Sequence, residues 1–181
     1  MKRNRVLYAR YPLTSVLIYN GITILHFVLG GIGLILGYLH WWGYLLGSIY
    51  IVFAFAEMYL LMPIKVCPNC PYSKLEKSLC ISGLNGLSRK FVKGGNIKDF
   101  QHRAKGMFCP NNLYLASLAI PVLALIPAVV INFSYALLAI WLVVIGLLAF
   151  RFFFLFPKIA CGYCKAKNIC PNAKAMGLGS N

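Results

Sequence analysis

Four long apolar runs dominate the pattern of hydrophobic and polar positions along the chain. They cover residues 13–39, 41–64, 113–131 and 134–156, and polar segments separate them. Each run comes close to or exceeds the roughly 20 residues that an α-helix needs to cross about 30 Å of hydrocarbon. The pattern therefore predicts an all-α integral membrane protein with four transmembrane helices.

The composition agrees with burial of these runs in lipid. Hydrophobic residues make up 60% of the 181 residues and charged residues only 12%, whereas a soluble domain of this size leaves much of its surface in water. The first run is also longer than the apolar part of a cleaved signal peptide, roughly 7 to 15 residues, and no small-residue cleavage site follows it. We expect it to remain in the protein as a permanent helix.

Positive charge lies on one side of the predicted topology. The formal net charge is +15, and the basic residues outside the runs precede the first run, separate the second from the third, or follow the fourth: Lys2, Arg3, Arg5, Arg10, Lys65, Lys74, Lys77, Arg89, Lys90, Lys93, Lys98, Arg103, Lys105, Lys158, Lys165, Lys167 and Lys174. Residues 37–43 and 131–135, the two other connections, contain no Lys or Arg. By the positive-inside rule, the basic side and both termini are cytoplasmic. These flanks favour contact with anionic lipid headgroups and argue against nucleic acid as a partner.

Two similar segments follow the second and fourth runs. Residues 63–70 read PIKVCPNC and residues 157–164 read PKIACGYC, which align without a gap. The alignment predicts two repeated helical hairpins, related by a pseudo-twofold axis along the membrane normal. The expected organisation is a first hairpin in residues 1–70, a basic loop subdomain in 71–108, a second hairpin in 109–164 and a tail in 165–181.

All seven cysteines fall on the predicted cytoplasmic side, outside the apolar runs: Cys67, Cys70, Cys80, Cys109, Cys161, Cys164 and Cys170. Cytosolic thiols are kept reduced, so metal ligation or redox chemistry is favoured over structural disulfides. Each Cys-x-x-Cys pair puts two thiolates on one turn, where both can bind one tetrahedral metal or one edge of a cluster. We therefore expect a Cys-rich metal-binding cap on the cytoplasmic face.

The spacing leaves the ligand grouping and the metal open. Three groupings are possible: Cys67 and Cys70 with Cys80 and Cys109, Cys67 and Cys70 with Cys161 and Cys164, or two sites that share all seven. Cysteine precedes proline four times, as it does at the end of the bacterial ferredoxin motif, which favours an iron–sulfur cluster. An all-cysteine zinc site is the alternative, followed by redox-active thiols.

Three ionisable residues lie within the predicted spans and are the candidate catalytic residues. The repeat offset places Glu57 opposite Arg151 at nearly the same depth, which makes them candidate partners in a buried ion pair. His26 is near the middle of the first span and is either a hydrogen-bonded core residue or a proton relay or quinone contact.

The sequence favours a redox function. A cytoplasmic-face metal centre would pass electrons from a soluble donor to a membrane acceptor such as a quinone. One alternative is a membrane scaffold or transport subunit whose loops are held together by zinc, and it could form a homo-oligomer. The other is a membrane thiol oxidoreductase. The last resembles the small four-helix membrane enzymes that drive disulfide formation, but their cysteines face the oxidising side. No Walker loop, Rossmann fingerprint or hydrolase motif occurs.

Overall fold

The computed structural model describes residues 6–92, 94–102 and 109–178. Six basic residues used in the charge argument, Lys2, Arg3, Arg5, Lys93, Arg103 and Lys105, lie outside these ranges. Helices make up most of the described chain, which contains no strand but only two isolated bridges, Tyr8 with Cys164 and Arg10 with Leu79.

Four helices are long and apolar enough to cross a membrane. They are α1 (Leu13–Gly37), a second helix made of α2 (Trp41–Ala56), η1 (Glu57–Val66) and η2 (Cys67–Asn69), then α6 (Pro110–Ile131), and a fourth made of α7 (Tyr135–Phe150), η3 (Arg151–Ala160) and η4 (Cys161–Tyr163). The prediction of an all-helical chain with four such helices is confirmed.

Local sequence explains where the helices begin and how two of them change form. Pro110 occupies the first turn of α6, and Ser134 caps α7 by accepting a hydrogen bond from the Leu137 amide at 3.1 Å. The stretches η1 and η3 of the second and fourth helices each contain one proline, Pro63 and Pro157. Because proline has no N–H to donate, the α-helical ladder is interrupted there. Both helices run through this stretch as π-helix and end in one 3-10 turn.

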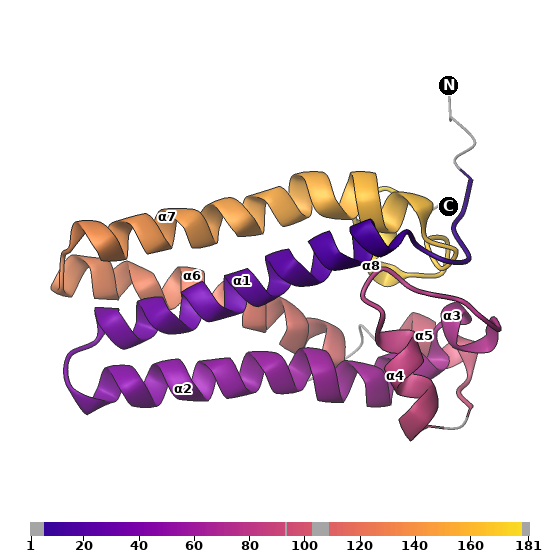
Figure 1. Ribbon diagram of the computed structural model, residues 1–181, viewed down its shortest axis with the longest axis horizontal. Coiled ribbons are helices and arrows are strands. Elements are labelled where there is room, and N and C mark those ends of the chain that lie inside the picture. Colours follow the sequence, from indigo (N-terminus) through magenta and orange to yellow (C-terminus); the bar gives the residue numbers. More distant parts are fainter. Residues whose placement is uncertain (1–5, 93, 103–108, 179–181) are drawn as a thin grey trace.

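The two central helices are α1 and α6, and α2 and α7 lie on either side of them (Figure 1). Helix α1 packs against all three others. Small residues permit this: a Cβ on Gly37 of α1 would lie 2.6 Å from the Ala128 Cβ of α6, and one on Gly31 would lie 2.4 Å from Ile51 of α2.

Replacing Gly31 by valine is expected to lower the free energy of unfolding in detergent by about 1–3 kcal/mol, because the new side chain must displace the Ile51 side chain of α2. Gly21→Val is the matched control, since a Cβ on Gly21 of the same helix meets nothing within 4 Å. Chemical denaturation in micelles measures both. Equal losses would mean that the effect comes from helix propensity and not from the close contact.

The two ends of the bundle differ in composition. Exposed aromatic residues lie at the end with the short turns, and include Trp41, Trp42, Phe133 and Tyr135, as at a membrane–water interface. The opposite end, here called the cap end, carries the short helices α3 (Pro71–Lys74), α4 (Leu84–Phe91), α5 (Ile97–His102) and α8 (Pro171–Ala175) (Figure 1).

Hydrogen bonds fasten the segment before α1 to the loops of the cap end. The Tyr8 amide donates to the Tyr163 carbonyl at 2.9 Å, and the Tyr11 amide donates to the Leu79 carbonyl at the same distance. The Tyr72 hydroxyl donates to the Tyr8 carbonyl at 2.6 Å. The segment therefore joins the loop after the second helix to the turn that ends the fourth.

Candidate functional site

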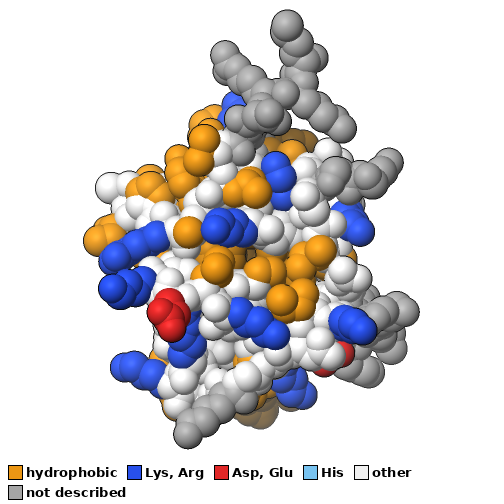
Figure 2. All heavy atoms as spheres, turned by 90° about the vertical axis from the view of Figure 1, so that its right-hand side faces the viewer, with side chains coloured by type: hydrophobic (Ala, Val, Ile, Leu, Met, Phe, Trp, Pro, Cys, Tyr) orange, Lys and Arg blue, Asp and Glu red, His pale blue; other side chains and the backbone are white. Residues whose placement is uncertain are grey.

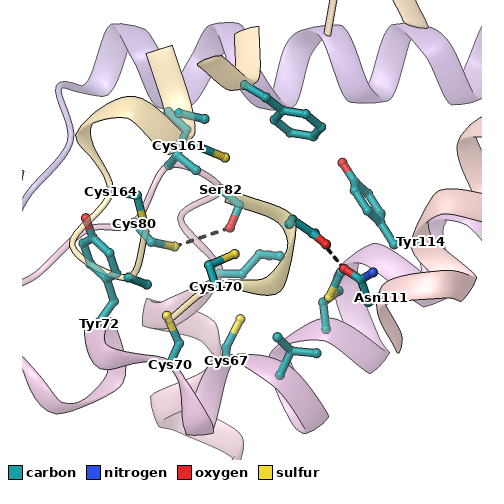
Figure 3. Close-up of a pocket in the computed structure, with 18 of the residues that line it drawn as sticks. Cys67, Cys70, Tyr72, Cys80, Ser82, Asn111, Tyr114, Cys161, Cys164 and Cys170 are labelled. Carbon is teal, nitrogen blue, oxygen red and sulfur yellow. Dashed lines mark hydrogen bonds between the residues drawn. The ribbon is translucent and has the colours of Figure 1, made fainter. Parts of the chain in front are cut away.

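A cavity of about 190 Å³ lies where the four-helix bundle meets the cap end. Six of the seven cysteines line it: Cys67, Cys70, Cys80, Cys161, Cys164 and Cys170 (Figure 3). We call this space the thiol cavity. The structure thus gathers most of the predicted metal ligands around one space.

Four separate segments of the chain supply these thiols. Cys67 and Cys70 come from the end of the second helix, and Cys161 and Cys164 from the end of the fourth. In each pair the second cysteine's amide donates to the first one's carbonyl, at 3.1 Å in the first pair and 3.2 Å in the second. Each Cys-x-x-Cys therefore forms the single tight turn that its spacing suggests.

The two remaining cavity cysteines come from irregular segments. Cys80 precedes α4, and its sulfur lies 3.4 Å from the Ser82 hydroxyl (Figure 3). Cys170 is the residue before α8. These segments bring in thiols whose positions depend on the fold and not on local spacing.

Cys109 has a different position. It is only 8% exposed, it is not among the residues that line the thiol cavity, and its sulfur accepts a hydrogen bond from the Asn112 amide at 3.4 Å. That contact makes Cys109 the N-cap of α6. Two of the three expected ligand groupings include Cys109, which is not among the residues that line the thiol cavity.

The thiols surround the cavity without converging on one point. Within the described ranges, no three His, Cys, Asp or Glu side chains are placed to hold a metal ion together. None of the seven cysteines, all of which are described, forms a disulfide. Burial raises the pKa of the Cys164 thiol to about 11, so this group is protonated at neutral pH, and metal binding there would release a proton.

The wall of the cavity on the bundle side consists of aromatic, thioether and amide side chains. Tyr19 of α1 and Tyr114 of α6 meet there, with their hydroxyl oxygens 3.2 Å apart. Asn172 donates to the Asn111 side chain at 2.6 Å, which ties the segment of α8 to α6. These residues are not among the predicted site residues. The sequence signal that could have indicated them is the presence of hydroxyl and amide side chains near the cap end of α1 and of α6.

Arg151 lies behind this wall, at the start of η3. It is 1% exposed, and its guanidinium carbon lies 5.0 Å from the ring centroid of Tyr19 and 5.6 Å from that of Tyr114. It also donates to the Thr23 hydroxyl. Arg151 is therefore held by aromatic faces and one hydroxyl, a cation–π arrangement that gains strength when water is excluded.

The expected ion pair between Glu57 and Arg151 is not formed. Both carboxylate oxygens of Glu57 are buried without a hydrogen-bond partner, as are Nε and Nη1 of Arg151. Glu57 begins η1 and Arg151 begins η3, but the second and fourth helices lie on either side of α1 and α6 (Figure 1).

His26 is a buried, hydrogen-bonded core residue, which is the structural role considered for it. It is 1% exposed, and its Nε2 lies 3.1 Å from the Leu118 carbonyl oxygen of α6. Because a carbonyl only accepts, the neutral ring carries its proton on Nε2. The side chain joins the two central helices and is not among the residues that line the thiol cavity.

Comparison with protein-family models, curated proteins and solved structures finds no match for this chain.

Proposed function

We propose that this chain is a membrane-embedded redox component that carries a cysteine-ligated metal centre, most simply an iron–sulfur cluster. The observation that carries the proposal is the thiol cavity, where six cysteines from four segments surround one space. The centre would take electrons from a soluble donor at the cytoplasmic face and pass them to a membrane acceptor such as a quinone. The residues proposed to hold it are Cys67, Cys70, Cys80, Cys161, Cys164 and Cys170.

The chemistry of the donor set supports this choice. Thiolates are soft ligands that suit iron–sulfur clusters and zinc, and six sulfurs exceed the four that a single cluster or zinc ion uses. Ligation needs the cysteine side chains to rotate toward the cavity, which their places at helix ends and in loops permit. The basic residues of the cap end would stabilise the negative charge of a thiolate-ligated centre.

Zinc is the second candidate, and the position of Cys80 and Cys170 favours it. Both belong to irregular segments that a structural zinc would fasten beneath the helices. In that case the chain would be a scaffold or transport subunit and not an electron carrier.

Two further features belong to the same proposal. The second and fourth helices each run through 16 α-helical, 10 π-helical and three 3-10 residues, which supports the duplication of the hairpins. The described basic residues other than Arg151 lie at the cap end, which supports its assignment as the cytoplasmic face.

Electron paramagnetic resonance of anaerobically purified protein tests the redox function. We expect a paramagnetic centre that appears or disappears reversibly on addition of dithionite and then of an oxidant. Bound zinc with no reversible signal would replace the electron-transfer function with the scaffold.

Cysteine labelling tests the topology. Tyr135→Cys places a thiol at an 82% exposed position in the turn before α7, and Phe91→Cys places one at a 63% exposed position of α4. A membrane-impermeant maleimide added to intact cells is expected to label Tyr135→Cys, and to label neither Phe91→Cys nor the unsubstituted protein, whose partly exposed cysteines all lie at the cap end. Labelling of Phe91→Cys from outside would place the cap end on the outer face.

A further inference from the structure

We infer that the end face of the cap is a docking surface for a small acidic electron-carrier protein. The inference rests on the proposed function, because it names the kind of soluble donor that this redox centre would use.

The charge of the cap end is strongly biased. Seven basic side chains of its loops and short helices are exposed, namely Lys74, Lys77, Arg89, Lys90, Lys98, Lys165 and Lys174, against two exposed acidic ones, Glu76 and Asp99. Figure 2 shows this end of the molecule, with hydrophobic side chains near its centre and Lys and Arg side chains around them. A charged rim around an apolar centre suits brief, electrostatically steered encounters.

The orientation of the face favours a protein over lipid. Four membrane-crossing helices run along the long axis of the molecule, and the cap end closes that axis (Figure 1). Its end face therefore points away from the bilayer, so among the described basic residues anionic headgroups are nearest to those at the ends of the second and fourth helices, Lys65 and Lys158.

Part of the positive charge lies next to the thiol cavity. Lys165 follows Cys164 directly, and Lys174 lies on α8, which begins just after Cys170. Five of the six cavity cysteines are partly exposed. A partner bound at residues 165–174 would thus be close to the metal ligands.

The electron step itself needs only the two centres. One electron leaves the reduced iron–sulfur centre of the donor, which becomes oxidised. It enters the cysteine-ligated centre of this chain, which becomes reduced, and no bond or proton is exchanged.

Binding of an acidic plant-type ferredoxin to the protein in zwitterionic nanodiscs tests the inference. We expect binding at low salt that weakens by about tenfold or more in Lys165→Gln/Lys174→Gln, because the electrostatic attraction is lost. The control variant Lys65→Gln/Lys158→Gln removes two charges from the ends of the second and fourth helices and should change the dissociation constant less than about twofold, because those residues belong to η1 and η3 and not to the cap loops.

Each outcome bears on a different part of the account. No binding at low salt, or an equal loss in both variants, would overturn the docking surface. Loss only in the second variant, with competition by phosphatidylglycerol vesicles, would assign the charge to lipid. The same protein is assayed for iron, so binding without any metal centre would leave the surface intact and remove the redox function.

Discussion

Replacing Cys161 by serine is expected to reduce the iron bound per protein by half or more. Cys161 ends the fourth helix and lines the thiol cavity, and a serine hydroxyl is a much poorer ligand for a soft metal than a thiolate. Cys67→Ser, at the matching position of the second helix, should have the same effect if both hairpins contribute to one centre. Anaerobic purification followed by iron determination measures the loss.

Cys109→Ser is the matched control for these variants. Cys109 caps α6 and is not among the residues that line the cavity, and serine is among the best N-cap residues. Iron content and stability should therefore stay close to those of the unchanged protein. Loss of iron in Cys109→Ser with retention in Cys161→Ser would restore the grouping of Cys67, Cys70, Cys80 and Cys109.

Replacing Arg151 by alanine is expected to lower the free energy of unfolding by about 3–5 kcal/mol. The change removes a large, fully buried side chain and leaves a cavity among aromatic rings. It also removes the contacts of the guanidinium with Tyr19 and Tyr114. Denaturant titration in detergent micelles provides the measurement.

Glu57→Gln should cost less than about 1 kcal/mol, because the Glu57 carboxylate has no hydrogen-bond partner to lose. The losses of unfolding free energy in Arg151→Ala and Glu57→Gln should add within about 0.5 kcal/mol in the double variant, since residues without a shared contact do not couple. A coupling above about 1 kcal/mol would show that Glu57 and Arg151 interact after all. Thr23→Val removes the hydroxyl that Arg151 contacts together with the hydrogen bond of that hydroxyl to the Tyr19 carbonyl oxygen, so its cost sets an upper bound on the hydrogen-bond part of the Arg151 effect.

The membrane-crossing helices could be predicted because hydrocarbon leaves the backbone few choices. An apolar run such as residues 134–156 must satisfy its own hydrogen bonds in lipid, and a helix does so within the run. The turns of Cys67 with Cys70 and of Cys161 with Cys164 could also be predicted from the sequence, because a spacing of two residues between cysteines fixes a local geometry.

The partners of buried groups could not be predicted, because they depend on how helices are arranged around one another. The repeat gives Glu57 and Arg151 similar depths, but depth does not decide which helix faces which. For the same reason, neither the contact of Tyr19 with Tyr114 nor the separation of Cys109 from the other thiols follows from spacing. These features arise from the central positions of α1 and α6 (Figure 1).

Iron and acid-labile sulfide analysis, with the visible absorption spectrum, on protein purified without oxygen tests the central claim most directly. We expect iron and sulfide in comparable amounts and a broad visible absorption that bleaches on reduction. Zinc alone, or protein without metal whose seven thiols all react with a thiol reagent after denaturation, would contradict the assignment of the thiol cavity as a redox centre.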